Sequence, residues 1–376
     1  MLYPLHELQR LSFDAVSTFA EGLRHLPLPF VRAQAALLHR ITKAYPKPAF
    51  GLTGEEIVID RPFVRLVHFT QARTSLPKVL VVAPLSGHHA TLVRDTIATL
   101  LLDHDVFVTD WRDAREVSLD HGTFSLDDYI TELRLFIAHL DRPHIVAVCQ
   151  PTVPTLAAVA LDAAANAPAP KSLTLMGGPV DARRSPTVVD KLATDHPIEW
   201  FEAQMIHTVP DRFAGRGRRV YPGFLQLAAF VMMNPDRHAQ AYWRYWLDQM
   251  RGNADGIAMH EKFYDEYNAV LDMDARYYLD TVRIVFQEFA LARGTWRVHG
   301  ELVDPSKITA TPIFAIEGEQ DDISGLGQTE AALELATNAP DKRHLVAPVG
   351  HYGLFSGSRW RDAIYPEVRG FIHAHE

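Results

Sequence analysis

Short apolar runs rich in Val and Ile recur along the chain, and they limit the folds that are open to it. The runs are flanked by Pro, Gly or Asp and cover residues 79–83, 106–109, 145–148, 173–176, 313–316 and 344–347. Runs this short predict strands that are buried on both faces. Helical stretches at 91–102 and 126–140 lie between the earlier runs. This alternation predicts an α/β fold with a mostly parallel sheet and helices on both of its faces.

Two further regions belong to the predicted body of the protein. Residues 55–69 predict a β-hairpin. Residues 181–300 contain no clear buried strand, are helical in pattern and are rich in aromatic side chains. We therefore expect a helical, aromatic-rich cap at 181–300, inserted between two parts of the α/β core at 51–180 and 301–376. Most of its aromatic residues are expected to pack against one another, and the rest to line a pocket.

Residues 1–50 predict an N-terminal helical arm. Apolar residues recur there at helical intervals, and prolines end the region; these residues are Leu5, Leu8, Leu11, Phe13, Val16, Pro46 and Pro48. We expect the arm to pack on the body of its own chain. Packing on a partner is the alternative.

Composition excludes several classes of protein. The chain has 376 residues, 47% of them hydrophobic, and a formal net charge of −9, which fits a globular protein without a basic field for nucleic acid. A local basic cluster is expected to be a solvated loop, with a site for an acidic group as the alternative; it comprises Arg212, Arg216, Arg218 and Arg219. The single cysteine allows no intrachain disulfide and fits a reducing cytosol. We find no signal-peptide pattern and no apolar stretch of about 18 residues, so no membrane span is expected.

Cys149 stands at the end of the predicted strand 145–148, and a helical pattern begins a few residues later. A strand, a sharp turn and a helix with a nucleophilic residue at the turn form the nucleophile elbow of α/β-hydrolases. The positive end of the following helix stabilises a thiolate there. Pro151 fits the first turn of a helix, where its missing N–H is not needed. The backbone N–H of Gln150 is a candidate donor to an oxyanion.

A cysteine nucleophile needs a base, and the base needs an orienting group. In the α/β-hydrolase fold these follow the nucleophile in the order acid, then histidine. Asp321 follows the predicted strand 313–316, and His351 follows the strand 344–347 between two glycines. We therefore predict Asp321 and His351 as the partners of Cys149. The adjacent Asp322 is an alternative to Asp321.

The loop after the strand 79–83 is predicted to supply the second oxyanion donor. The backbone N–H groups of Leu85 and Ser86 are the candidates. Ser86 is also an alternative, serine nucleophile, although the elbow belongs to a later strand. His88 and His89 indicate a metal only weakly, because no further ligand stands beside them at a suitable spacing.

The segment 147–154, Ala-Val-Cys-Gln-Pro-Thr-Val-Pro, resembles the nucleophile box of the intracellular polyhydroxybutyrate depolymerases. In that family a cysteine replaces the serine of lipases, and the Gln-Pro after it is typical. The segments 176–183 and 350–357 also resemble this family, and the resemblance extends over nearly the whole chain. The segments 109–112 and 303–308 are similar to the related polyhydroxyalkanoate synthases, which usually keep glycines around their cysteine.

The resemblance implies an intracellular enzyme at the surface of cytoplasmic storage granules. It would cleave the ester bonds of poly(3-hydroxybutyrate) through an acyl-enzyme on Cys149, with His351 as base, Asp321 as its orienting group, and Gln150 and the Leu85–Ser86 region as oxyanion donors. No cofactor, metal or nucleic-acid partner is implied, and a homo-oligomer is compatible with the sequence. Two alternatives stay open: a polyhydroxyalkanoate synthase, and a non-catalytic granule-associated protein.

Overall fold

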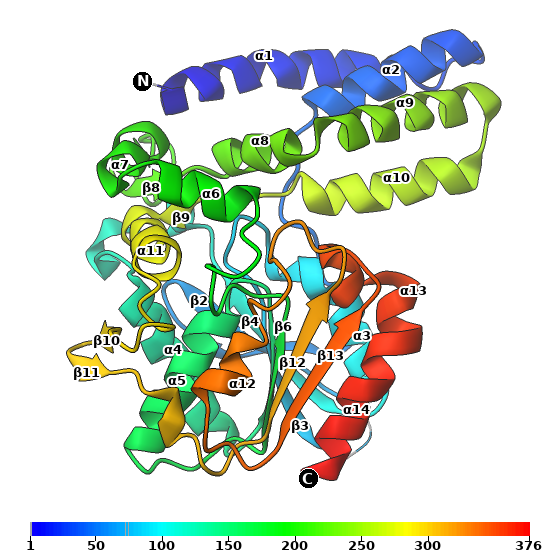
Figure 1. Cartoon of the computed structure of the whole chain (residues 1–376). Helices are drawn as coiled ribbons and strands as arrows, with labels where there is room; N and C mark the ends of the chain where they lie inside the picture. Colours follow the sequence, from blue (N-terminus) through cyan, green and yellow to red (C-terminus); the bar gives the residue numbers. More distant parts are fainter. Residues whose placement is uncertain (1, 72, 74) are drawn as a thin grey trace.

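A computed structural model of the chain describes residues 2–71, 73 and 75–376 (Figure 1). An eight-stranded sheet with the order β1-β2-β4-β3-β5-β6-β12-β13 forms its centre. The strands are β1 (Glu55–Asp60), β2 (Val64–Phe69), β3 (Lys78–Val82), β4 (Asp105–Trp111), β5 (His144–Val148), β6 (Ser172–Met176), β12 (Ile313–Gly318) and β13 (Lys342–Ala347). β2 pairs antiparallel with β1 and with β4, and all pairs from β4 to β13 are parallel. The predicted α/β fold with a mostly parallel sheet, including the hairpin at 55–69, is confirmed.

Helices cover both faces of this sheet, as the alternating pattern predicts. α4 (Leu126–Leu140) and α5 (Thr152–Ala164) lie on one face, and α3 (Arg94–Leu100) and α14 (Tyr365–Ala374) lie on the other (Figure 1). Strand β5 shows the division: Ile145 and Ala147 belong to the apolar core under α4 and α5, whereas Val146 and Val148 belong to the core under α3 and α14. Alternate side chains of a strand point to opposite faces, so β5 is buried on both sides.

The sequence predictions need three corrections in these elements. The helix expected at 91–102 begins as a 3₁₀ turn, Ala90–Val93, and its α-helical part ends at Leu100. The run 344–347 is not buried on both faces: β13 is an edge strand, and its Val346 is 42% exposed. The region 181–300 also contains a small three-stranded sheet of β7 (His207–Thr208), β8 (Arg219–Tyr221) and β9 (Met273–Asp274). Strands of two or three residues are too short for a periodic pattern to reveal them.

A layer of helices lies beyond the carboxyl ends of the parallel strands, where the arrowheads of β12 and β13 point (Figure 1). Its helices are α6 (Val188–Asp195), α7 (Ile198–Met205), α8 (Gly223–Met233), α9 (Pro235–Arg251), α10 (Ala254–Tyr267) and α11 (Ala275–Thr281). Ligands bind at this end of an open parallel sheet. The division of the chain into arm, core and cap stays a prediction.

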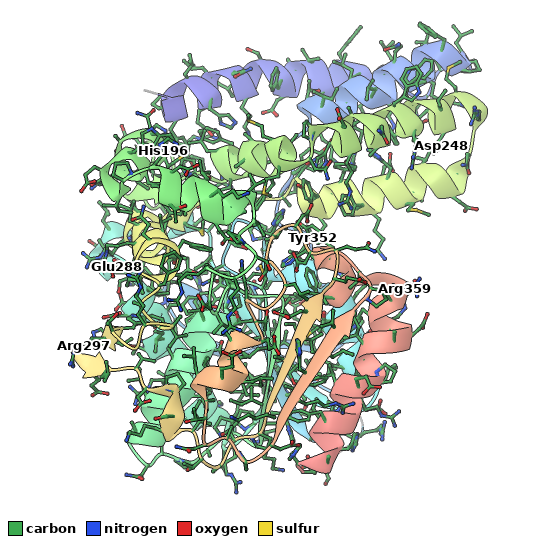
Figure 2. The ribbon with its side chains drawn as sticks, in the orientation of Figure 1. His196, Asp248, Glu288, Arg297, Tyr352 and Arg359 are labelled. Carbon is green, nitrogen blue, oxygen red and sulfur yellow. The ribbon has the colours of Figure 1, made fainter. Side chains whose placement is uncertain are left out.

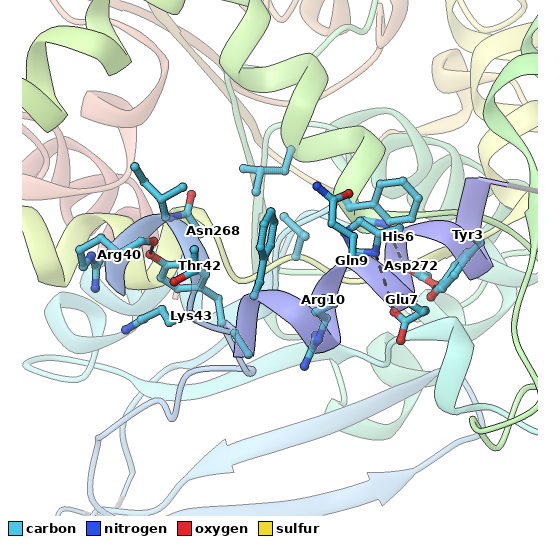
Figure 3. Close-up of a pocket in the computed structure, with 18 of the residues that line it drawn as sticks. Tyr3, His6, Glu7, Gln9, Arg10, Arg40, Thr42, Lys43, Asn268 and Asp272 are labelled. Carbon is cyan, nitrogen blue, oxygen red and sulfur yellow. Dashed lines mark hydrogen bonds and ion pairs between the residues drawn. The ribbon is translucent and has the colours of Figure 1, made fainter. Parts of the chain in front are cut away.

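The N-terminal arm consists of α1 (Leu2–Leu23) and α2 (Pro29–Thr42), which lie across α8 and α9 (Figure 1). A cavity of mixed polar and apolar character lies between α1, α2 and the body of the protein (Figure 3). At one end of it, the hydroxyl of the buried Tyr3 donates to Asp272 Oδ2 at 2.6 Å. The apolar residues expected to pack on the body do not all do so: Leu5, Leu8 and Leu11 are 62%, 64% and 61% exposed. The opposite, more polar face of α1 makes the contact, and the expectation for these leucines is wrong.

The basic cluster at 212–219 is not a uniformly solvated loop. Arg218 is buried, forms an ion pair with Asp274 at 2.8 Å, and donates to the backbone carbonyls of Val117, Ser118 and Gly122. The guanidinium group of Arg218 is therefore paired inside the fold, where its hydrogen bonds connect the start of β8 to the loop after β4. Among the described residues, no helix is long and apolar enough to cross a membrane.

Candidate active site

Cys149 occupies the turn between β5 and α5, as the elbow pattern predicts. Its φ is +69°, a left-handed conformation that side chains other than glycine rarely adopt. The turn is fixed by backbone hydrogen bonds: the N–H of Cys149 donates to the carbonyl of Met176 at 2.7 Å, and its own carbonyl accepts from the N–H of Thr152 at 3.1 Å. A strained residue that is held this firmly is typical of a functional position.

Two glycines after β6 make room for the elbow. A Cβ on Gly178 would lie 1.8 Å from the Thr152 Oγ1 and 2.4 Å from the Cys149 carbonyl oxygen. Gly177 has a φ of +58°, and a Cβ there would lie 2.6 Å from Leu354. Any larger side chain at these positions would displace the nucleophile turn. Glycine is therefore required, because the backbone after β6 lies in close contact with this turn. The steric function of this Gly-Gly pair was not predicted from the sequence, because the contact joins segments that are distant along the chain.

Asp321 and His351 meet at the carboxyl edge of the sheet. Asp321 follows β12, and its Oδ2 lies 2.8 Å from the Nδ1 of His351. The other oxygen, Oδ1, accepts from the N–H groups of Ile323 and Ser324, both at 2.9 Å. Both oxygens of the Asp321 carboxylate thus have hydrogen-bond partners, and Oδ2 faces the imidazole. Asp322 is exposed, and the contact with His351 is made by Asp321, which stays the predicted orienting group.

His351 is buried at the start of a 3₁₀ turn after β13. Burial by itself lowers the pKa of its imidazole, because it disfavours the charged form. The interactions of His351 with Cys149 and with Asp321 outweigh burial and raise the pKa of His351 well above 6.5. The imidazole contacts Asp321 and lines the same cavity as Cys149. In Figure 2 the neighbouring Tyr352 marks the place of this turn, between the sheet and the helical layer.

Leu85, Ser86 and Gln150 line the same cavity as Cys149 and His351. The hydroxyl of Tyr277 donates to the Leu85 carbonyl at 3.2 Å. In a trans peptide the N–H points opposite to the carbonyl, so this contact turns the N–H of Ser86 away from Tyr277. The structure thus brings the predicted oxyanion residues to one cavity, and their function as donors stays a prediction. Tyr277 was noted in the sequence only as one of many aromatic residues.

The cavity around Cys149 has a volume of about 500 Å³ and a predominantly apolar wall. Besides the residues above, side chains of α6, α8 and α11 line it, together with the segments next to them. The aromatic residues among them are Phe201, Tyr221, Phe230, Tyr277, Tyr278 and Phe286. A cavity of this size and character suits an apolar chain of several units better than a charged metabolite.

Other chemical groups near the site are structural. His88 is buried, and its Nε2 lies 3.0 Å from the carbonyl oxygen of Tyr267; burial lowers the pKa of His88 to about 4 and that of His89 to about 3. Both imidazoles are therefore neutral at pH 7. Among the described residues, no hydrogen bond joins Ser86 to a histidine, whereas His351 pairs with Asp321.

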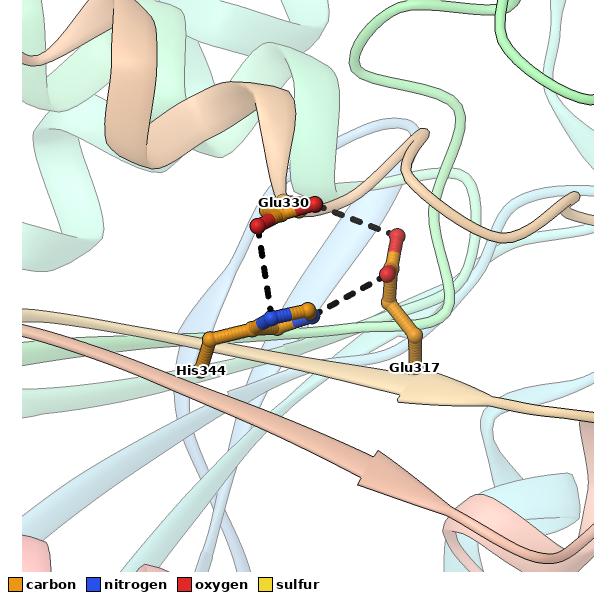
Figure 4. A group of neighbouring side chains, drawn as sticks. All are labelled: Glu317, Glu330 and His344. Atoms are coloured by element: carbon orange, nitrogen blue, oxygen red, sulfur yellow. Dashed lines mark hydrogen bonds and ion pairs between the residues drawn. The ribbon is translucent and has the colours of Figure 1, made fainter.

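Glu317, Glu330 and His344 form the one group of three potential metal ligands within the described part of the chain (Figure 4). The Glu317 carboxylate is already occupied. It accepts from the backbone N–H groups of Gly327, Thr329 and Glu330 at 3.0, 2.7 and 3.1 Å, and it lies 3.1 Å from His344 Nε2. These contacts fix the start of α12 (Ala331–Leu335) against β12, a structural function that needs no ion.

Comparisons with known proteins agree with this architecture. A family model described as "PHB de-polymerase C-terminus" matches residues 177–376, which include Asp321 and His351 but not Cys149. No curated protein matches the sequence. The chain is similar to the Bacillus megaterium epoxide hydrolase, with 13% identity, coverage of 84% of this chain and 99% of that one, and a TM-score of 0.50. It is also similar to a putative lipase from Acinetobacter baumannii AYE, with 14% identity, 92% and 97% coverage and a TM-score of 0.46. The likeness to the epoxide hydrolase shows the α/β-hydrolase fold alone.

Proposed function

Because this chain belongs to the PHB depolymerase family, we propose that it hydrolyses the ester bonds of poly(3-hydroxybutyrate) through a covalent intermediate on Cys149. One observation carries the cysteine mechanism. His351 pairs with Asp321 at 2.8 Å and lines the same apolar cavity as Cys149. Nucleophile, base and orienting group in this arrangement support acyl transfer.

The proposed reaction has two steps. The Cys149 sulfur attacks the ester carbonyl carbon, and its proton resides on His351, whose charged form Asp321 stabilises. The tetrahedral oxyanion accepts hydrogen bonds from the backbone N–H groups of Gln150 and of the Leu85–Ser86 loop. When the intermediate collapses, the C–O bond breaks and His351 protonates the leaving alcohol. Water, activated by the same imidazole, then attacks the thioester, releases the acid and returns the proton to the sulfur.

The polyester substrate also suggests where the protein acts. We propose that it works at the surface of storage granules and that residues 181–300 act as the cap that guides a polymer chain to Cys149. The aromatic wall of the cavity supports the second point, because a neutral chain of alkyl and ester groups is held mainly by apolar contact.

Release of soluble 3-hydroxybutyrate from amorphous polyester particles tests this function. We expect release by the wild type, a loss of about 10³-fold or more in Cys149→Ala, and most of the activity in Ser86→Ala, which keeps its backbone N–H. Full activity of Cys149→Ala together with an inactive Ser86→Ala would favour the serine alternative. Polymer formation from 3-hydroxybutyryl-CoA without any release would favour the synthase alternative.

A further inference from the structure

Helix α8 is apolar on all sides and yet lies at the surface. Its sequence, Gly-Phe-Leu-Gln-Leu-Ala-Ala-Phe-Val-Met-Met, contains no charged residue and one polar side chain, Gln226. Only Gly223 and Gln226 are buried, and Met232 is 78% exposed. A helix that is apolar all round normally lies inside a protein or another apolar medium. The exposure of α8 therefore leaves apolar surface that a partner can cover.

The position of α8 is fixed, so its exposure belongs to the fold. The Gln226 side-chain nitrogen donates to the carbonyls of Tyr221 and Leu271, at 3.0 and 3.2 Å. The N–H of Gly223 donates to Asp272 Oδ1 at 2.8 Å, and a Cβ at Gly223 would lie 2.9 Å from the Leu271 carbonyl oxygen. The first turns of α8 are thus held against the segment before β9. In the second half of the helix, Ala228, Ala229 and Met232 are exposed, whereas Phe230 and Met233 are half-buried and face the cavity.

This exposed surface continues into the cavity that contains Cys149. Phe230, Met232 and Met233 of α8 line the cavity, and so do Val188 and Leu192 of α6. Val188 is 62% exposed and Leu192 is 43% exposed, so these residues form the mouth of the cavity and part of the outer surface at once. Helices α6 and α8 are neighbours in Figure 1. We call Val188, Leu192 and Met232 the apolar rim.

We propose that the apolar rim and the exposed face of α8 are the surface through which the protein adsorbs to amorphous polyester and draws a chain toward Cys149. This inference rests on the proposed function. The surface fits the polyester because α8 offers no charge to an ionic headgroup or an ionic protein partner, and the interior of the polymer offers neither charge nor hydrogen-bond donor. The flexible side chain of Met232 suits an irregular surface.

Adsorption to particles of amorphous poly(3-hydroxybutyrate) tests the proposal. The full-length chain carries Cys149→Ala in all samples, so the particles are not consumed. The test variant is V188Q/L192Q/M232Q, and the matched control is L5Q/L8Q/L11Q, whose leucines are equally exposed on α1. We expect the rim variant to bind at least about tenfold more weakly and the control to bind like its parent. Thermal unfolding checks that both are folded, and the single variant Met232→Gln, at the most exposed position, should weaken binding in the same direction.

The other possible outcomes of the adsorption experiment also test the docking surface. Unchanged adsorption of the rim variant, or an equal loss in the α1 control, would overturn the docking surface. A wild-type dimer that becomes monomeric in the rim variant would identify a second copy of the chain as the occupant and would also overturn it. Adsorption that depends on the rim, without any release of 3-hydroxybutyrate by the protein with Cys149 intact, would refute the proposed hydrolysis and leave the docking surface standing.

Discussion

At the scale of single residues, the raised pKa of His351 is the feature with the most direct chemical consequence. The charge of Cys149 is the largest of the contributions that raise the pKa of His351 against the opposing effect of burial. A base whose raised pKa keeps it protonated is ready to give its proton to a leaving alcohol.

Cys149→Ala is predicted to lower the pKa of His351, because the substitution removes both the thiolate charge and its hydrogen bond and leaves burial in place. The Asp321→Asn variant should shift the pKa in the same direction. Titration of the imidazole by NMR measures both. The raised pKa of His351 stabilises the wild type below the pKa of an unfolded histidine, and this contribution is lost as the pH rises through the raised pKa. A pKa that does not move in Cys149→Ala would show that the sulfur and the ring do not interact.

The left-handed backbone of Cys149 gives a second prediction for this residue. Glycine adopts a φ of +69° without steric cost, whereas alanine does not. We expect Cys149→Gly to be more stable toward urea than Cys149→Ala by about 1 kcal/mol, the reverse of their order in ordinary secondary structure. Both should be inactive. Equal stability, or a more stable alanine variant, would mean that the elbow relaxes when the cysteine is removed.

At the scale of elements, the nucleophile turn depends on a close contact between the two glycines that follow β6 and the start of α5. Gly178→Ala places a methyl group inside the contact distance of Thr152 and the Cys149 carbonyl. We expect a loss of about 1–3 kcal/mol in stability and a fall in activity, since the nucleophile turn must shift. Gly370→Ala is the matched control. Gly370 lies in α14 with nothing within 4 Å of its added Cβ, so it should gain about 0.5–1 kcal/mol. Urea unfolding distinguishes the pair, and a tolerated Gly178→Ala would contradict the packing described.

The main strands could be predicted from the sequence because each combines a buried apolar run with turn residues at its ends. The order of Cys149, Asp321 and His351 along the chain was also readable, because each follows its own strand. Hydrophobic periodicity did not predict elements that are very short, nor the orientation of a helix whose apolar residues face outward. β7 to β9 are too short to show alternation. α1 has apolar residues on its outward face, and spacing alone does not tell which face meets the body. Contacts such as Gly178 with Thr152 join distant segments, so no local pattern contains them.

At the scale of the whole molecule, the fold places three features at one end. The carboxyl edge of the sheet presents Cys149, Asp321 and His351, the helical layer encloses the cavity above them, and the apolar rim opens that cavity to the outside. The chain has a formal net charge of −9. The uncharged α8 lies at the mouth of the cavity. Such an arrangement suits a substrate that does not dissolve.

The proposed mechanism places the acyl group on Cys149, and this acyl-enzyme can be detected by mass spectrometry. Wild-type protein is mixed with a soluble oligomer of 3-hydroxybutyrate and quenched in acid during turnover, and its peptides are examined by mass spectrometry. Cys149 is the one cysteine in the sequence, so a thioester has a single place to form. We predict a 3-hydroxyacyl group on the peptide that contains Cys149, and none on any peptide of Cys149→Ala. An acyl group on the peptide that contains Ser86, or undiminished turnover by Cys149→Ala, would contradict the account.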